Sequence, residues 1–345
     1  MTMPHSAQTE GRQTSLLDLL PAEDPPTPPS RLGRTAIAAH SPTRPKELCN
    51  NQFPIRFVDH FAGIGGFHLA LERLGAQCVF ATEHDRFARM TYENNFAGRS
   101  PELFAEGRFA GDIADANPQD IPTHDIVTAG FPCQPFSFAG RQRGLDDERG
   151  VMFYQLARLI MHTRPAAFIF ENVAGLRFHN HGTTFAAIRE TMTTQLGYSF
   201  HTAVLRACDY GLPQLRPRLF MVGFRDPSTP FSFPEPVPLQ FTLSDLFGGQ
   251  CDRELAHTLL ASGFNKHVGQ KFNFDAYLVD SREHRLTARE AASLQGFPED
   301  FLLPAMRSRA LKQIGNAVAV PVATSVGRQV IAALQTRSAH QEARS

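Results

Sequence analysis

The sequence lacks the features that would place it in a membrane, in a secreted disulfide scaffold or around a structural metal. Its five cysteines are widely spaced and include no CxxC pair, which argues against a disulfide framework and against a zinc site. No window of residues approaches the 18 or so consecutive apolar positions of a membrane span. The N-terminus has no apolar signal-peptide core. We therefore predict an intracellular, cytoplasmic protein with no bound metal and no membrane partner.

The chain also has no excess of positive or negative charge. Its 34 basic residues balance 34 acidic ones, so the formal net charge is zero. No global field indicates a nucleic-acid partner, and any such binding must use a local patch. With 345 residues, 42% of them apolar, the chain has enough material for one large domain and a smaller one.

The two ends of the chain differ from the rest. Residues 1–52 hold 8 of the 25 prolines and show no sustained periodicity, so we expect them to be disordered. For residues 15–21, an inert tail is favoured over a short docking helix. Residues 336–345 are expected to fray. The folded region between these ends is expected to comprise a domain over 53–225, a small region over 226–285 and C-terminal helices over 286–335.

The folded region opens with IRFVDHFAGIGGFHLALERLG, a pattern of apolar strand, glycine turn and amphipathic helix. The turn contains Gly63, Gly65 and Gly66. A second predicted strand ends at Glu83, 20 residues after Gly63, which is the separation at which an acidic side chain binds ribose hydroxyls. Position 68 is histidine, so the dinucleotide fingerprint is incomplete there. The pattern suits a smaller adenosyl ligand, and a plain tight turn is the alternative.

Two further predicted buried strands are each followed by side chains that can act as a nucleophile, an acid or a hydrogen-bond donor. Cys133, flanked by two prolines, follows the apolar run of DIVTAG, and Glu171 and Asn172 end the run AAFIFEN. The carboxyl ends of parallel strands meet at one edge of a sheet, where ligands bind. We therefore predict an α/β fold with a doubly wound, mostly parallel sheet and an active site at this edge. The alternatives are a structural cysteine in a turn and a glutamate that only forms hydrogen bonds.

Three other positions allow two interpretations each. Asp112 follows a short strand, where it can accept from an adenine amino group or cap a helix. Arg216 and Arg218 are two residues apart, so we expect them on one face of a strand. Two guanidiniums there suit a phosphate or a base carbonyl, and a solvated strand edge is the alternative.

The C-terminal part begins with a region of weak pattern and ends in helices. Between Asp226 and His284 prolines are frequent and apolar runs are short. A capping box from Thr287 to Glu290 then predicts a helix. A glycine-asparagine turn at Gly315 and Asn316 is expected before a last apolar helix.

Taken together, eight segments resemble the DNA (cytosine-5)-methyltransferase family, in order and across about residues 55–334: FAGIGGF, EHD, GDI, GFPCQPFS, ENV, QLRPR, RLTAREAASLQGFP and QIGNAVAVP. The pair FPCQPFS and ENV is the most specific of them. The likeness is greatest to small bacterial restriction-modification methyltransferases. It implies an S-adenosylmethionine-dependent, Rossmann-like enzyme that methylates carbon 5 of a flipped-out cytosine in DNA.

The resemblance implies a cofactor site and assigns its residues. The pocket residues are Phe61, Ala62, Gly63, Ile64, Gly65, Gly66 and Pro132. Glu83 binds the ribose, Asp112 and Ile113 meet the adenine, and Asn316 with Ala317 closes the pocket. His84 stands where the family often has tryptophan, so stacking on the adenine is expected to be weaker.

The resemblance also implies a reaction. Carbon 5 of cytosine is a poor nucleophile, so the thiolate of Cys133 first adds to carbon 6. Glu171 protonates or shares a proton with nitrogen 3, Arg218 holds the base carbonyl, and Arg216 supports a phosphate or the fold. Asn172 belongs to the same catalytic motif. The DNA-contacting loop after the cysteine is implied to use Gln134, Ser137, Arg141, Arg143 and Arg149.

One departure concerns the region between Arg225 and Arg285, where the family usually carries a longer target-recognition domain. Readout of a sequence through the major groove needs a surface. We therefore expect loose or very short target specificity, or recognition by a second chain. A non-catalytic subunit and an RNA substrate are the alternatives.

Overall fold

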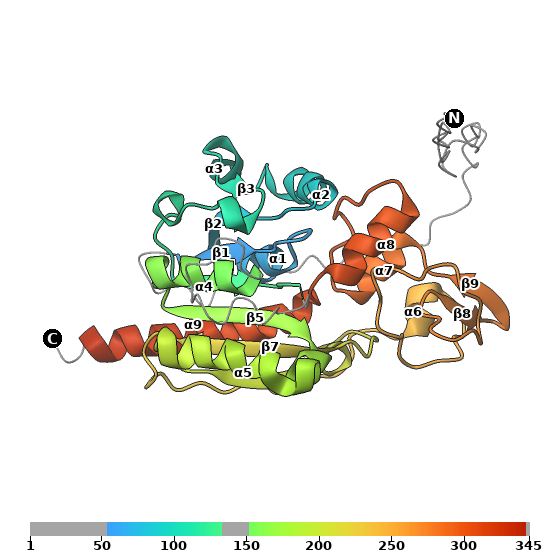
Figure 1. The fold of residues 1–345 in the computed structure, drawn as a ribbon. Coiled ribbons are helices and arrows are strands. Elements are labelled where there is room, and N and C mark those ends of the chain that lie inside the picture. The colour runs from blue at the N-terminus through green and yellow to red at the C-terminus, as the bar shows by residue number, and fades with distance from the viewer. Residues whose placement is uncertain (1–53, 133–151, 343–345) are drawn as a thin grey trace, which may run out of the picture. The chain divides into compact units, whose positions relative to one another are not determined.

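The computed structural model describes residues 54–132 and 152–342, with side chains as far as residue 336 (Figure 1). By its internal contacts the chain divides into Met1–Asn50 and Asn51–Ser345, and all described residues belong to the second unit. The expected disorder of residues 1–52 therefore lies outside the described residues.

The described residues alternate strands and helices, as the sequence predicts. The strands are β1 (Arg56–His60), β2 (Gln77–Thr82), β3 (Phe109–Ala110), β4 (Ile126–Ala129), β5 (Ala167–Val173), β6 (His201–Arg206), β7 (Pro217–Phe224), β8 (Ala276–Val279) and β9 (Arg282–Arg285). The helices are α1 (Gly66–Glu72), α2 (Arg86–Phe96), α3 (Pro101–Ala105), α4 (Met152–Thr163), α5 (Thr183–Glu190), α6 (Leu243–Phe247), α7 (Ala288–Leu294), α8 (Arg307–Asn316) and α9 (Val320–Glu342).

Seven strands form one sheet in the order β3-β2-β1-β4-β5-β7-β6. The first five are mutually parallel, and β7 is antiparallel to both β5 and β6. This confirms the predicted doubly wound, mostly parallel sheet. The strand order reverses between β1 and β4, and a crevice for ligands opens at the carboxyl ends of the strands at such a switch point.

The core has two layers, one on each face of the sheet. Central strands such as β4 and β5 are apolar along nearly their whole length because helices cover both faces. One buried cluster contains α1, α2 and α9, and the other contains α4 and α5. Leu156 and Leu159 of α4 lie in the second cluster.

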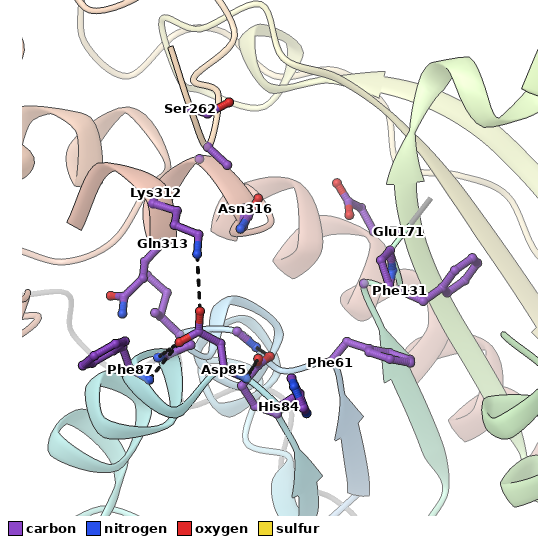
Figure 2. A pocket seen from close by; sticks show the side chains of 18 of the residues that line it. Phe61, His84, Asp85, Phe87, Phe131, Glu171, Ser262, Lys312, Gln313 and Asn316 are labelled. Carbon is purple, nitrogen blue, oxygen red and sulfur yellow. Dashed lines mark hydrogen bonds and ion pairs between the residues drawn. The ribbon is translucent and has the colours of Figure 1, made fainter. Parts of the chain in front are cut away.

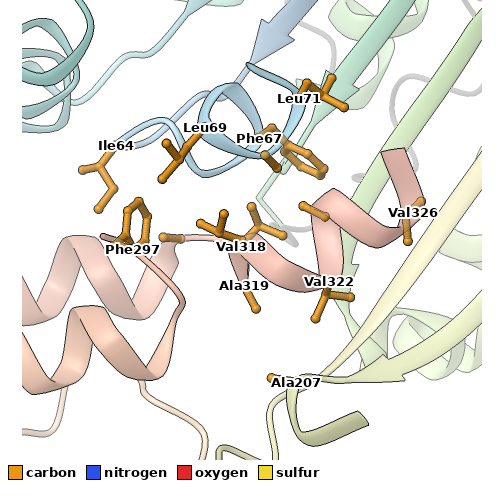
Figure 3. Close-up of a cluster of buried hydrophobic side chains, with 14 of the residues drawn as sticks. Ile64, Phe67, Leu69, Leu71, Ala207, Phe297, Val318, Ala319, Val322 and Val326 are labelled. Carbon is orange, nitrogen blue, oxygen red and sulfur yellow. The ribbon is translucent and has the colours of Figure 1, made fainter. Parts of the chain in front are cut away.

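Helix α9, near the C-terminus, packs against α1, near the start of the described residues. Val318, just before α9, packs against α1 (Figure 3), and a Cβ at Gly327 of α9 would lie 2.5 Å from Leu71 Cδ2 of α1. The approach is close, since a Cβ at Gly66 would lie 2.7 Å from Val318 Cγ1. Among the described residues, one stretch, Arg307–Thr336, is long and apolar enough to span a membrane, but 67% of its most apolar window is buried in the protein, as in a core helix.

The C-terminal part corrects two expectations. Gly315 and Asn316 do not form a turn, because they are the last two residues of α8. A Cβ at Gly315 would meet the backbone of Leu260, so glycine at this position allows two distant segments to pack. The end of the chain was expected to fray from residue 336, but α9 continues to Glu342, and residues 336–342 contain no glycine or proline.

The small region after Arg225 contains few regular elements. Helix α6 begins with a capping box formed by Thr242 and Asp245, and β8 and β9 form an antiparallel hairpin. The predicted capping box of Thr287 and Glu290 is present at the start of α7. Between Arg225 and Arg285, α6 and this hairpin are the helix and strand elements that the structure has.

Candidate active site

A cavity of about 1100 Å³ opens at the carboxyl ends of the central strands. Strand register places it there. His60, Thr82 and Ala129 lie level on neighbouring strands, and Ala129 is opposite Phe170 of β5. The next residues along these four strands are Phe61, Glu83, Gly130 and Glu171, and all four line the cavity. Figure 2 shows Glu171 and Phe131 at one end, Asp85 and Lys312 at the other, and Asn316 between them.

The cavity brings together most of the residues assigned from the sequence. Those that line it are Phe61, Gly63, Ile64, Glu83, His84, Asp112, Ile113, Pro132, Glu171, Asn172, Arg216, Arg218 and Asn316. Gly65 and Gly66 do not line it and instead pack against Phe96 and Val318. Ala62 and Ala317 are buried behind the wall.

The Glu83 side chain forms a hydrogen bond with the glycine turn. Its carboxylate accepts from the N–H of Gly63 (2.8 Å) and from the N–H of Asp85 (2.7 Å). Burial raises the pKa of Glu83, and these two hydrogen bonds oppose the rise. Gly63 has a φ of 58°, a conformation that favours glycine. The 20-residue spacing noted in the sequence thus corresponds to a direct contact, and the carboxylate has lone pairs left for hydroxyl donors.

Asp112 caps a helix, which is one of its two alternative interpretations, and its contact with an adenine amino group stays a prediction. Its Oδ1 accepts from the N–H of Ala114 and caps the short 3₁₀ helix that follows. Its Oδ2 lies 3.4 Å from His84 Nδ1 at the cavity wall. The His84 side chain is 84% exposed, and weak stacking on the adenine at this position stays a prediction.

The sequence did not single out Phe87, which also lines this wall. The guanidinium of Arg309 lies 3.7 Å from the ring centroid of Phe87, and that of Arg86 lies 4.4 Å away. Phe87 stands four residues after Glu83, in the first turn of α2. That spacing was the available signal, but α8, which supplies Arg309, is more than 200 residues away in sequence.

The carboxyl end of β4 leads directly to the end of the cavity where Glu171 lies. Asn172 Nδ2 donates to the carbonyl of Phe131 (2.9 Å), which ties the end of β5 to the end of β4. A Cβ at Gly130 would lie 3.7 Å from Glu171 Oε2. The next residue after Pro132 is Cys133, which lies outside the described residues, as do Gln134, Ser137, Arg141, Arg143 and Arg149.

Glu171 and Arg218 form a buried ion pair. Arg218 Nε lies 3.0 Å from Glu171 Oε1. The two side chains share one face of the sheet, because Arg218 is opposite Val173, two residues after Glu171. Glu171 is 8% exposed, and its burial raises the pKa of the carboxyl even though Arg218 and Arg216 oppose that rise. The group therefore holds a proton at higher pH than an ordinary glutamate does.

The structure corrects the placement of Arg216. It does not share a strand face with Arg218, because β7 begins at Pro217 and Arg216 precedes it with a φ of 23°. Arg216 is 2% exposed and donates to the carbonyls of Leu259 (3.0 Å), Gly315 (3.0 Å) and Ala317 (2.6 Å). Burial, together with Arg218, lowers the pKa of Arg216 to about 9. Of its two alternative roles, these contacts favour support of the fold.

We expect Arg216→Met to lower the free energy of unfolding by about 3 kcal/mol, because three buried carbonyls lose their donor and each costs about 1–3 kcal/mol, part of it offset by no longer burying a charge. Arg218→Met is the matched control two residues away. It breaks no contact to α8, so it should lose activity with much less loss of stability. Chemical denaturation of both variants checks this, and equal midpoints for Arg216→Met and the wild type would contradict it.

The C-terminal segment supplies a wall that the sequence assigned only to Asn316 and Ala317. One part of this wall is the segment from Ala261 to Phe264. The other part comes from α8 and its N-cap and consists of Met306, Ser308, Arg309, Lys312 and Gln313. Lys312 Nζ lies 3.6 Å from Asp85 Oδ2 across the cavity (Figure 2). These residues were missed because nothing local in their sequence indicates a ligand.

Within residues 54–132 and 152–342, no group of three histidine, cysteine, aspartate or glutamate side chains is arranged to hold a metal ion.

Comparison with known proteins found one matching family and relatives that cover most of the chain. The family described as C-5 cytosine-specific DNA methylase matches residues 55–260 and 250–332. Type II methyltransferase M.HhaI from Haemophilus parahaemolyticus is 36% identical over 309 residues, which cover 78% of this chain and 91% of that one. Type II methyltransferase M.NgoBI from Neisseria gonorrhoeae is 39% identical over 297 residues, covering 77% and 89%.

A solved structure has the same fold. The mutant DNMT2 of Spodoptera frugiperda superposes with a TM-score of 0.60 at 16% identity, covering 80% of this chain and 99% of that one. At this identity the likeness concerns the fold alone. With the family match and relatives above 30% identity over most of its length, the chain belongs to the C-5 cytosine-specific DNA methylase family.

Proposed function

We propose that this chain transfers a methyl group from S-adenosylmethionine to carbon 5 of cytosine in DNA, through an adduct between Cys133 and carbon 6. The observation that carries the assignment of roles is the buried pair of Glu171 and Arg218 beside the end of β4, the strand that leads to Cys133. A carboxyl with a raised pKa next to a guanidinium suits a ring that must be protonated and held by its carbonyl.

The other end of the cavity fits the adenosyl group of the cofactor. Glu83 offers carboxylate oxygens for ribose hydroxyls, and Asp112 offers Oδ2 for an amino group. Phe87 supplies an apolar ring, and Gly63 keeps the backbone bare of a side chain. When bound, S-adenosylmethionine supplies an electrophilic methyl group on a sulfonium. Every other step belongs to residues of the chain.

In the proposed reaction, the proton that Glu171 gives is returned and the bond to sulfur that forms is later broken. Glu171 gives a proton to nitrogen 3 while the Cys133 thiolate forms the sulfur–carbon 6 bond, and electron density moves to carbon 5. Arg218 binds the carbonyl oxygen at carbon 2, where negative charge develops. After carbon 5 gains the methyl group, it loses its proton to a base, the sulfur–carbon 6 bond breaks and nitrogen 3 returns its proton to Glu171.

The substrate base must leave the duplex for this reaction. Carbon 6 is inaccessible inside a stacked helix, so the cytosine is flipped into the cavity, which costs a few kcal/mol. A volume of about 1100 Å³ is large enough for a nucleobase and a nucleoside cofactor together. The loop from Gln134 to Gly150 lies outside the described residues, and its assignment to DNA contacts remains our proposal.

We further propose a role in a restriction-modification system inside the cell, because the relatives at 36% and 39% identity are named Type II methyltransferases. The small region between Arg225 and Arg285 supports a short or loose target, read by this chain or with a second one. Its α6 and the β8–β9 hairpin offer little regular surface for base readout.

The test is an assay of the purified chain with labelled S-adenosylmethionine and plasmid DNA, followed by bisulfite sequencing. We expect incorporation of label and protection of cytosines in one short sequence context. Absence of label, alone or with a partner encoded beside it, would defeat the proposal. Label found on adenine or on the amino group of cytosine would defeat the mechanism.

A further inference from the structure

Asp59 is a fully buried carboxylic acid that the proposed reaction does not use. It lies on β1, where its Oδ1 accepts from the hydroxyl of Thr128 (2.8 Å). Its Oδ2 makes no hydrogen bond with any residue that the structure describes. The charged side chain that acts on it is another acid, Glu83. Burial and the neighbouring acid both oppose a negative charge on Asp59.

Strand register places Asp59 beneath the floor of the cavity. Asp59 is level with Ala81 of β2 and with Thr128 of β4. The residues two positions further along the three strands line the cavity, and they are Phe61, Glu83 and Gly130. Because a strand rises about 3.3 Å per residue, roughly 7 Å separates Asp59 from this floor along the strand.

The order of the strands places the same residue under the middle of the cofactor. Strand β1 lies between β2 and β4 in the sheet. In the proposed function the ribose binds at Glu83, after β2, and the methyl group is directed to the end of β4, which leads to Cys133. The sulfonium that joins these two parts of the cofactor therefore lies over the end of β1, where its charge acts on Asp59.

The other titratable side chains packed around Asp59 keep one charge state near neutral pH. Burial raises the pKa of Cys78 on β2 and of Tyr92 on α2, and it lowers the pKa of His68 on α1. Burial also raises the pKa of Asp59 to about 7, against the effect of its hydrogen bonds, and raises the pKa of Glu83. Asp59 and Glu83 are therefore the two groups here whose charge can respond to a bound cation.

We propose that Asp59 makes the cofactor site selective for charge: its carboxyl releases a proton to solvent when the S-adenosylmethionine cation binds, and keeps that proton when the product S-adenosylhomocysteine binds. The product has lost the methyl group and carries a neutral thioether sulfur in place of the sulfonium. A nearby positive charge favours the ionised carboxyl, and a neutral sulfur does not. The inference rests on the proposed function, to which it adds a residue that favours the cofactor over the spent product.

Proton release is measured on the wild type by isothermal titration calorimetry of both ligands at about pH 6.5, in buffers that differ in ionisation enthalpy. We expect S-adenosylmethionine to release about 0.5 proton more than S-adenosylhomocysteine. The two ligands share their adenosyl and amino acid parts, so titration at the adenine wall cancels in the difference. The ligand amine stays protonated, because an α-amino group titrates at about 7.7–8.0.

Asp59→Asn removes the titrating proton and keeps an oxygen for Thr128, so we expect the difference in proton release to vanish. In the wild type, the ratio of the Kd of S-adenosylhomocysteine to that of S-adenosylmethionine should rise on the order of fivefold between about pH 5.5 and 7. In Asp59→Asn the ratio should stay constant. Asp125→Asn, which changes a half-buried acid at the opposite end of β4, is the control that keeps both wild-type results.

Glu83→Gln separates the two buried acids. It should weaken the binding of both ligands and keep the difference in proton release, because the responding group is Asp59. Loss of this difference in Glu83→Gln, with its retention in Asp59→Asn, would overturn the proposal in favour of Glu83.

Equal proton release by the two ligands in the wild type would also overturn the proposal, and this result does not depend on how any variant folds. Found together with methyl transfer, it would leave the proposed function intact. A chain that binds S-adenosylmethionine with release of the proton, but transfers no methyl group to DNA, would refute the proposed function and support the role of Asp59.

Discussion

Replacing Cys133 by serine is expected to abolish methyl transfer to cytosine. The serine hydroxyl ionises far above neutral pH, so almost no oxyanion is present to attack carbon 6, whereas a thiol with pKa near 8.5 supplies thiolate and is intrinsically a strong nucleophile. We expect a loss of at least about 10³-fold, because no other route activates carbon 5. Incorporation of labelled methyl groups measures the effect.

A covalent trap separates the proposed adduct from a loss of folding. In DNA that contains 5-fluorocytosine, carbon 5 has no proton to lose after methylation, so the sulfur–carbon 6 bond persists. The wild type should form a denaturant-stable complex with this DNA, and Cys133→Ser should not. Cys208→Ser, which changes a half-buried free cysteine, is the control that keeps both activity and adduct. Methyl transfer retained by Cys133→Ser would refute the mechanism.

Replacing Glu171 by glutamine is expected to lower the rate of methyl transfer by about 10²–10⁴-fold, the usual contribution of a general acid. The glutamine amide can hydrogen-bond to nitrogen 3 but cannot give it a proton. Single-turnover rates with saturating cofactor measure the loss. Glu190→Gln, exposed at the end of α5, is the control. A rate within a few-fold of the wild type would exclude Glu171 as the proton donor.

The raised pKa of Glu171 gives this prediction a pH dependence. Because burial raises the pKa, the protonated donor persists at higher pH, and the wild-type rate should fall as pH rises through that raised value. The residual rate of Glu171→Gln should lack this fall. The same shift makes the wild-type fold less stable relative to the variant as pH rises through the folded-state pKa, because the folded state binds the proton more tightly than the unfolded state does. Denaturation at several pH values checks the sign.

Local sequence was enough for the parts of the site that lie at strand ends. Apolar runs mark β1, β4 and β5 because both faces of these strands are covered. A parallel sheet then brings the residues after each run to one edge, so Glu171 and Glu83 were placed correctly from their positions in sequence. The capping box at Thr287 was equally readable, since a helix cap is a local pattern.

Contacts between distant segments were not readable in this way. Arg216 and Arg218 look equivalent in the motif QLRPR, but Pro217 begins the strand, and only the arrival of α8 gives Arg216 its carbonyl partners. Gly315 was taken for a turn because glycine and asparagine usually mark one, whereas in the fold it allows α8 to approach Leu260. The four-residue spacing after Glu83 was the one local signal for Phe87, and its position at the cavity wall beside Arg309 had to come from the structure.

The sequence by itself determined the class of fold, the family and the residues that follow the central strands, because these depend on periodicity and on short motifs. The tertiary structure alone decided which of two neighbouring arginines pairs with Glu171 and which is buried against backbone carbonyls, and which aromatic ring lines the cavity. The physical reason is that burial and pairing are set by segments far apart in the chain, and no local pattern records which of them will meet.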